Sequence, residues 1–262
     1  MPIHDQSYRR YKGERAPKGR SWTVIAKSGI KLMLGKKKFL ALVVLAWLPF
    51  VVRAVQFYVA ANFPQASMIA PGPSTFNEFI EQQGVFVFFV TIFVGAGLIA
   101  NDMRANALQI YLAKPLGRAE YVAGKFAVLA FFLLLVTWLP ATMLVLLQVV
   151  FAGNLSFLTT NIYLLPAILV VTCTQTLVLG FVMLALSSLS KSSRFVGIMY
   201  AGIFFFMDAL YGVVFVVTRD TGFSWMSPRA NLTQFADIIF RVEPTYRTSG
   251  LVTAVALAAT LA

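Results

Sequence analysis

Six apolar runs follow one another along this chain, with shorter polar segments between them. They cover about residues 39–60, 80–100, 121–151, 163–189, 195–217 and 249–262. A helix of about 20 apolar residues crosses the hydrocarbon core of a bilayer, and the first five runs reach that length. The sixth run stops at Ala262 after about 14 residues, or roughly 20 Å of helix, so we expect a missing C-terminal tail. The pattern predicts an all-α, polytopic membrane protein with about six transmembrane helices.

The polar segments predict how the chain is organised around these spans. Residues 1–38 form a basic tail followed by an amphipathic segment, residues 39–262 form a single transmembrane domain, and residues 218–248 form an outer loop region. The amphipathic segment predicts an N-terminal helix lying in the membrane interface. Its apolar face comprises Trp22, Ile25, Gly29, Leu32 and Met33.

Two local features predict departures from straight, isolated helices. Pro140 lies inside the third run, where a proline bends or breaks a helix. Gly95 and Gly97 lie near the end of the second run, where small residues let neighbouring helices approach closely.

Composition agrees with a membrane protein and changes the interpretation of the charge. Hydrophobic residues make up 59% of the 262 residues, charged residues only 12%, and the mean hydropathy is +0.77. The formal net charge is +12, from 22 Lys and Arg against 10 Asp and Glu, and half of the basic residues precede Phe39. In this setting the partner of the basic residues is an anionic membrane leaflet and not nucleic acid.

The distribution of Lys and Arg predicts a cytoplasmic N-terminus in a bacterial inner membrane. Basic residues concentrate before Phe39 and between the second and third runs, while residues 61–83 contain none and are expected outside. By alternation residues 218–248 also lie outside, although they contain Arg219, Arg229, Arg241 and Arg247. The alternative is that one of the five preceding runs is re-entrant.

Few residues of this chain could carry metal or nucleophilic chemistry. Cys173 is the only cysteine and lies in an apolar run, and His4 is the only histidine and lies in the polar tail. We therefore expect no metal site and no cofactor bound by this chain.

The polar insert from Ala100 to Lys125 is the segment most able to act on a partner. Met103, Ala107 and Leu108 begin a three- and four-residue apolar spacing that predicts a short amphipathic helix ending before Pro115. Asp102 lies near the positive end of this helix. Such a helix either lies on lipid headgroups or docks onto a soluble protein.

The insert resembles the coupling segment between the second and third membrane helices of type-2 ABC transporter permeases. The likeness is carried by Asn101-Asp102-x-Arg104-x-x-Ala107-Leu108-x-x-Tyr111-Leu112-Ala113-Lys114-Pro115-Leu116-x-Arg118-x-x-Tyr121-x-x-Gly124-Lys125. The chain has Asn106-Ala107 where many members of that family have Gly-Thr.

The resemblance implies a function and a set of partners. The chain would be the membrane-spanning permease subunit of an ATP-binding cassette transporter, with ATP and Mg²⁺ held by a separate nucleotide-binding subunit. It would pair with a second, identical or related permease copy, and an additional periplasmic or accessory subunit could join them. The contact residues implied for the ATPase are Asp102, Arg104, Leu108, Tyr111 and Arg118.

A second set of candidate residues is polar and lies within the apolar runs. It comprises Arg53, Asp208, Thr172, Thr174, Gln175 and Thr176. An ionised side chain alone in lipid costs several kcal/mol, so we hypothesise that Arg53 and Asp208 pair or face a shared polar cavity. The alternative is that Arg53 reaches outward to the interface and Asp208 meets a hydroxyl group or water. The four residues of the fourth run should face other helices.

Two other classes of function remain open. An ion channel or a non-transporting scaffold subunit could use the polar residues of the fourth and fifth runs to line a pore. A membrane-embedded enzyme would need clustered acids, a nucleophile with a base, or metal ligands. The apolar runs offer one central acid, Asp208, and no histidine, which disfavours the enzyme.

Overall fold

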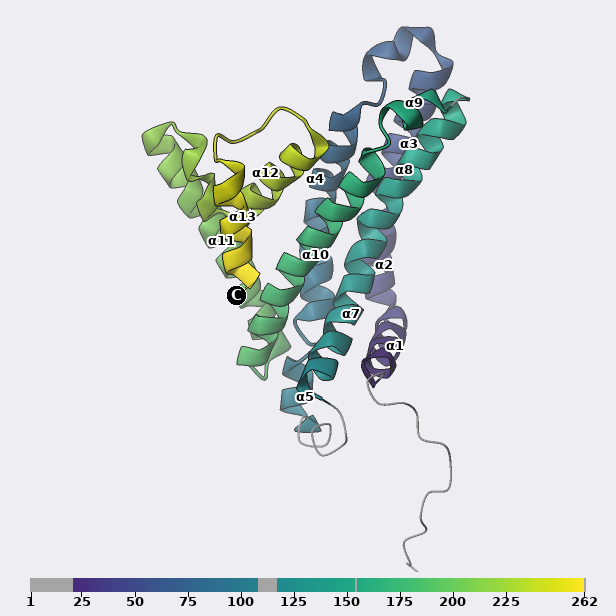
Figure 1. The fold of residues 1–262 in the computed structure, drawn as a ribbon. Coiled ribbons are helices and arrows are strands. Elements are labelled where there is room, and N and C mark those ends of the chain that lie inside the picture. Colours follow the sequence, from purple (N-terminus) through teal and green to yellow (C-terminus); the bar gives the residue numbers. More distant parts are fainter. Residues whose placement is uncertain (1–20, 108–116, 154, 262) are drawn as a thin grey trace, which may run out of the picture.

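The computed structural model describes residues 21–107, 117–153 and 155–261, and every regular element in these ranges is a helix (Figure 1). Five helical stretches in these ranges are long and apolar enough to cross a membrane. They are Lys37–Asn62, Pro73–Arg104, Arg118–Ala152, Leu164–Leu189 and Ser193–Thr218. The prediction of an all-α fold is confirmed for these residues, and the five long apolar helices indicate a membrane protein.

The first of these stretches is bent, and a small helix precedes it. Helix α1 (Ser21–Leu34) leads into α2 (Lys37–Ala46) and α3 (Leu48–Asn62), which are separated at Trp47. Pro49 explains the break, because its ring excludes the carbonyl of Leu45 from the helical hydrogen-bond ladder. A short 3₁₀ helix, η1 (Pro64–Ile69), follows.

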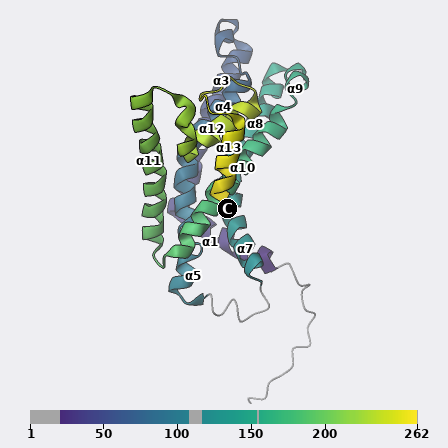
Figure 2. The same ribbon diagram turned by 60° about the vertical axis from the view of Figure 1, so that its left-hand side comes forward.

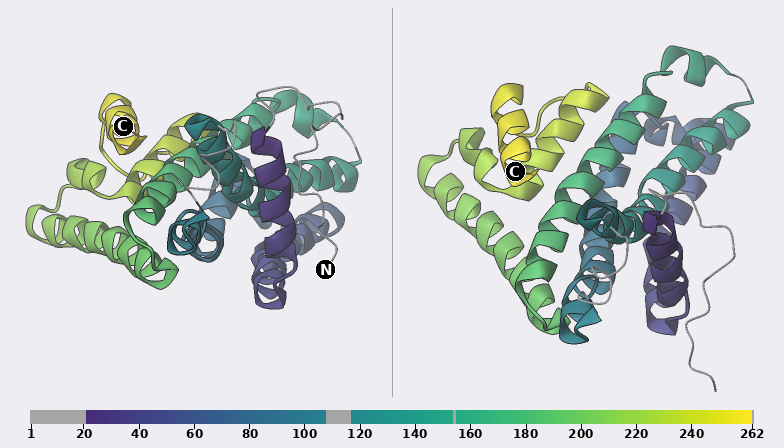
Figure 3. Two further views of the ribbon diagram at one scale, coloured as in Figure 1. Left: turned by 90° about the horizontal axis from the view of Figure 1, so that it is seen from below. Right: turned by 60° about the horizontal axis from the view of Figure 1, so that its bottom comes forward.

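Helix α1 matches the predicted amphipathic helix and lies across the end of the bundle (Figure 3). It packs mainly against α7 (Arg118–Val136). A Cβ atom built on Gly124 of α7 would lie 2.8 Å from the Cβ atom of Ile25, so glycine permits this close approach. Of the predicted apolar face, Met33 is buried, whereas Leu32 is 68% exposed.

The second stretch begins earlier than predicted. Helix α4 (Pro73–Val90) starts at Pro73 and not near residue 80, because Pro73 suits the first helical position and Thr75 completes the cap. The Thr75 hydroxyl accepts a hydrogen bond from the Gly72 N–H group at 3.1 Å. The helix continues through a π-helical turn, η2 (Thr91–Gly95), to the short α5 (Ala100–Arg104).

The predicted bend of the third stretch is confirmed, and the predicted close packing is confirmed for Gly95 but not for Gly97, whose nearest side chain is Asn101 of the same stretch. Helix α7 is separated from α8 (Trp138–Ala152) at Thr137, three residues before Pro140. A Cβ atom on Gly95 would lie 2.3 Å from the Cγ atom of Met183, which places η2 tightly against α10 (Leu164–Leu189). The short helix α9 (Ser156–Thr160) joins α8 to α10.

Helix α11 (Ser193–Thr218) diverges from the other long helices (Figures 1 and 2). It meets α10 near the end of the bundle that carries α5, and it meets η3 (Thr221–Met226) and α12 (Pro228–Phe240) at its other end. We call these the α5 end and the α9 end of the bundle. The gap that opens along α11 brings the candidate site described below to the surface of the helical bundle.

Residues 218–248, which the sequence predicts on the outer side, contain η3 and α12 and pack against the long helices. Helix α12 packs against α4, α10 and α11, and its polar residues Gln234 and Asp237 form hydrogen bonds inside the protein. Asp237 accepts a hydrogen bond from Asn77 Nδ2 at 2.7 Å and from the Thr245 N–H group at 2.8 Å. Gln234 Nε2 donates to the carbonyl oxygen of Thr248 at 3.0 Å. These bonds let a polar segment pack into the bundle, because buried polar groups need internal partners.

The final helix, α13 (Gly250–Leu261), packs against α12 and α10. Its 12 residues correspond to roughly 18 Å, which is shorter than the hydrocarbon core of about 30 Å. The structure therefore supports five of the six predicted spans and places a short apolar helix at the sixth.

Candidate functional site

The α5 end contains a sharp elbow where the second stretch turns towards α5. The Ser187 side chain of α10 is fully buried there and serves three backbone groups that the broken helix leaves free. Its Oγ atom accepts from the N–H groups of Ile99 and Ala100, each at 3.1 Å, and donates to the carbonyl oxygen of Ala96 at 3.0 Å. One hydroxyl therefore fixes the elbow to α10.

Asp102 fixes the same elbow to α7. Its Oδ2 atom lies 2.6 Å from Lys125 Nζ and accepts a hydrogen bond from the Tyr121 hydroxyl at 2.8 Å. The Lys125 ammonium also lies 5.5 Å from the centre of the Tyr121 ring. The Asp102 and Lys125 side chains are 17% and 13% exposed, so the pair is shielded from solvent. The Asp102 carboxylate is thus engaged within the chain, and its role as a partner contact stays a prediction.

The predicted helix of the insert is interrupted. Helix α5 ends at Arg104, and Asn106 adopts the left-handed conformation at φ 52°, which asparagine tolerates better than most residues. A continuous helix from Asp102 to Lys114 is therefore wrong. The predicted contact residues Leu108 and Tyr111 lie outside the described residues.

Arg104 and Arg118 are the predicted contact residues that face outward. Arg118 is the first residue of α7 and is exposed, while Arg104 is exposed and donates only a long hydrogen bond, 3.4 Å, to Asn101 Oδ1. Both residues lie at the α5 end of the bundle and are exposed.

Arg53 does not pair with Asp208, so the hypothesis of direct pairing is wrong. Arg53 donates to Glu78 Oε2 and to Gln56 Oε1, each at 3.0 Å. Arg53 lies on α3 and Asp208 on α11, and these helices lie on opposite sides of the bundle (Figure 1). Asp208 instead accepts a short hydrogen bond from the Ser227 hydroxyl, as the alternative predicted.

The predicted polar residues of α10 divide between packing and a cavity. Thr172 and Thr176 are buried, and Thr172 donates to the carbonyl oxygen of Ile168 at 2.7 Å. Thr174 is half-buried. Gln175 lines a cavity, so only one of the four lies at a candidate binding site.

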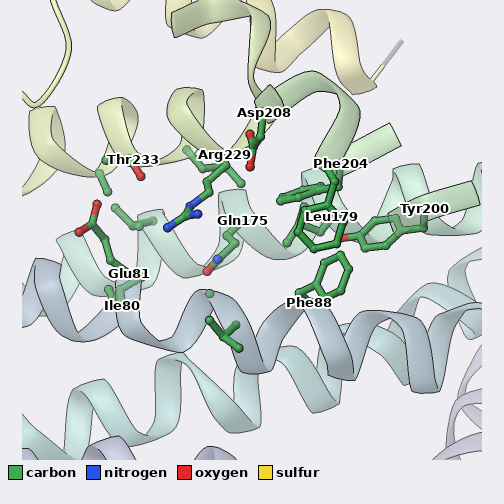
Figure 4. Close-up of a pocket in the computed structure, with 16 residues that line it drawn as sticks. Ile80, Glu81, Phe88, Gln175, Leu179, Tyr200, Phe204, Asp208, Arg229 and Thr233 are labelled. Atoms are coloured by element: carbon green, nitrogen blue, oxygen red, sulfur yellow. The ribbon is translucent and has the colours of Figure 1, made fainter. Parts of the chain in front are cut away.

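This cavity lies between α4, α10, α11 and α12 and has a volume of about 190 Å³. We call it the α11 cavity (Figure 4). One part of its wall is polar, and the opposite part is aromatic. The polar part comprises Glu81, Thr233, Arg229, Gln175 and Asp208.

The aromatic part of the α11 cavity is a cluster of three rings. The Phe88 ring lies 5.5 Å from the Tyr200 ring and 5.8 Å from the Phe204 ring, and the latter two lie 5.7 Å apart, between ring centres. Such spacing is typical of aromatic packing. The cavity can therefore hold a molecule with one apolar and one polar part.

Sequence reasoning missed Glu81 and Arg229, because it placed both in outer loops. The Gly72-Pro73 pair was the available signal, since proline at the first position starts a helix that carries Glu81. The sequence contains no comparable signal that would assign Arg229 to a cavity. Arg229 lines the cavity only because the tertiary fold packs α12 against α4, α10 and α11.

The described residues contain no group of three or more His, Cys, Asp or Glu side chains that could hold a metal ion. No protein-family model matches the chain. No curated protein matches it either.

Proposed function

We propose that this protein is the membrane-spanning permease subunit of an ATP-binding cassette transporter of the type-2 class. The observation that carries the proposal is the elbow at α5, which joins two long apolar stretches and is fastened to both α7 and α10. A fastened elbow transmits a push as a rigid-body displacement of the attached helices. A flexible loop would instead change its own conformation and leave the attached helices in place.

The charge distribution supports a cytoplasmic α5 end. Among the described residues, the α5 end carries ten Lys or Arg and two acids. The other half carries five Arg and six acids, so the arginines of residues 218–248 are offset locally. This asymmetry fits the positive-inside rule and a bacterial inner membrane with the N-terminus in the cytoplasm.

In this proposal ATP and Mg²⁺ belong to a separate nucleotide-binding subunit. That subunit would contact the outward side of the elbow, where Arg104 and Arg118 are exposed. A second permease copy and surrounding lipid would complete the membrane part, with an accessory subunit as a further partner.

Purification of the full chain from its native membrane tests the proposal. We expect a Mg²⁺-dependent ATPase activity to co-purify and to fall by about tenfold in an Arg104→Glu, Arg118→Glu variant, because reversed charges oppose the partner surface. The matched control is Arg219→Glu, an exposed arginine at the α9 end.

Three outcomes separate the proposal from its alternatives. A purified complex without ATPase activity would overturn it and favour a channel or scaffold subunit. Equal loss in the control variant would also contradict it, because the α9 end should not touch the ATPase. Ion conductance by the chain alone in planar bilayers would favour the channel.

A further inference from the structure

The α11 cavity contains polar atoms that nothing in the described part of the protein satisfies. The Tyr200 side chain is 1% exposed, yet its hydroxyl has no hydrogen-bond partner there. The Thr91 hydroxyl donates to the carbonyl oxygen of Val87 at 2.7 Å but keeps lone pairs that can accept from Tyr200, so Tyr200 alone does not indicate a ligand. The Gln175 Oε1 atom is also buried without a partner. Unsatisfied buried polar atoms in a cavity indicate a missing ligand or water.

The charges around the α11 cavity favour a cation. Glu81 and Asp208 contribute two carboxylates and Arg229 one guanidinium, and neither carboxylate forms an ion pair among the described residues. Asp237 lies on the same helix as Arg229, two turns further along α12. Its buried carboxylate also repels the carboxylate of Glu81. The region therefore has an excess of negative charge and repels an anion.

The aromatic cluster favours the same ligand. Phe88, Tyr200 and Phe204 turn towards the cavity opposite the polar wall (Figure 4). The faces of aromatic rings attract cations, most strongly where water is excluded, and they also accept apolar groups. A molecule with an ammonium group and an apolar body meets both walls.

The volume of the α11 cavity and the position of its opening further restrict the kinds of molecule that it can bind. A dry cavity of about 150 Å³ holds benzene, so a cavity of about 190 Å³ accepts a molecule somewhat larger than one aromatic ring. Val85 and Phe205 line the cavity and are 60% and 62% exposed, so its mouth is apolar and opens along the diverging helix α11. A lipophilic molecule can enter there from the hydrocarbon core.

We infer that the α11 cavity binds a small lipophilic amine in its protonated form. The ammonium group meets the polar wall, which carries Glu81 and Asp208, and donates a hydrogen bond to Gln175 Oε1, while the apolar body lies against Phe88 and Phe204. This inference deepens the proposed function and rests on it only for the statement that the protein transports such amines. The binding of the amine depends on the α11 cavity alone.

Binding of 2-phenylethylammonium to the full chain tests the inference. The chain is held in phosphatidylcholine nanodiscs, and heats of binding are measured at neutral pH against empty nanodiscs, which correct for partition into lipid. The comparison molecules are 2-phenylethanol, which is neutral, and 3-phenylpropionate, which is an anion. We expect the amine to bind at least about tenfold more tightly than either, because only it pairs with the carboxylates.

Two variants locate the bound amine. Glu81→Gln should weaken binding by about tenfold through loss of a charge partner. Phe88→Leu should weaken it by about threefold, since it removes a cation–π contact and keeps an apolar side chain. The matched control is Glu78→Gln on the same helix, because Glu78 lies outside the cavity and pairs with Arg53.

Equal binding of the amine and the alcohol would overturn the inference, and so would unchanged affinity in both cavity variants. An equal loss in the Glu78→Gln control would also contradict the assigned position. Failure of amine binding leaves the ATPase test untouched, and loss of ATPase co-purification leaves amine binding untouched. The two proposals can therefore fail separately.

Discussion

Asp102 and Glu81 are both carboxylates on the second apolar stretch, at opposite ends of the bundle, and their surroundings differ. Asp102 is neutralised within the chain by Lys125 and by the Tyr121 hydroxyl. Glu81 forms no ion pair among the described residues and lines a cavity. A buried charge held in a close ion pair keeps helices in place, whereas one that has only the more distant Arg229 opposite it is available to a ligand.

The helices around the two carboxylates differ in the same way. At the α5 end, α1, η2, α7 and α10 pack with glycines at their contacts, and the Ser187 hydroxyl satisfies the broken backbone. Around Glu81, α11 diverges and leaves the α11 cavity (Figure 2). We interpret the first region as the mechanical part of the protein and the second as its binding part.

Removing the charge of Asp102 should have the largest effect. Asp102→Asn leaves the Lys125 ammonium shielded from water without a counter-charge, and we expect the free energy of unfolding to fall by about 3 kcal/mol. Unfolding in mixed detergent micelles, followed by circular dichroism, measures it. Adding Lys125→Gln to this variant should restore part of the loss, because the stranded cation is removed. A loss below about 0.5 kcal/mol would show that the pair does not hold the elbow.

Filling the glycine contact at the α5 end should have the next largest effect. Gly124→Val places a side chain against Ile25 and the backbone of Trp22, and we expect a loss of about 1–3 kcal/mol from overpacking. The same unfolding measurement applies. The matched control is Gly212→Val on α11, where nothing lies within 4 Å of an added Cβ atom. Equal losses in the two variants would contradict the contrast in packing.

The exposed ion pair of Arg53 and Glu78 should contribute less to the free energy of unfolding than the shielded pair of Lys125 and Asp102. Glu78 is 55% exposed, so solvent screens its attraction to Arg53. We expect Glu78→Gln to lower the free energy of unfolding by less than about 1 kcal/mol. A loss as large as that of Asp102→Asn would mean that this pair also fastens the bundle.

The smallest effect on stability is expected for Glu81. Glu81→Gln should change the free energy of unfolding by less than about 0.5 kcal/mol, since Glu81 forms no ion pair among the described residues and Arg229 loses only a more distant attraction. The variant thus separates stability from ligand binding. A loss of several kcal/mol would place Glu81 with Asp102 among the charges that hold the fold.

Several features of the fold could be predicted from the sequence because they depend on local physics. The length of each apolar run predicts a helix that can cross a membrane, and Pro140 predicts a break that the structure places at Thr137. The start of α4 at Pro73 had a local signal as well. The burial of Thr172 and Thr176 followed from the cost of polar groups in lipid.

The partners of the charged residues could not be predicted in the same way. Arg53 and Asp208 lie at similar depths in their predicted spans, which made their pairing a reasonable hypothesis, but depth does not say which helices are neighbours. The structure pairs Arg53 with Glu78 and places Asp208 beside Ser227. It also brings Arg229 to the α11 cavity.

The sequence by itself determined that the chain is helical, which segments are long and apolar enough to cross a bilayer, and where the longest of them bends. Hydrophobic length and proline chemistry act within a few helical turns, so the sequence carries that information directly. Only the tertiary structure decided which carboxylate is neutralised, which helix diverges and where a cavity opens. Those outcomes depend on contacts between residues far apart in the chain, such as Asn77 with Asp237, and no local pattern encodes them.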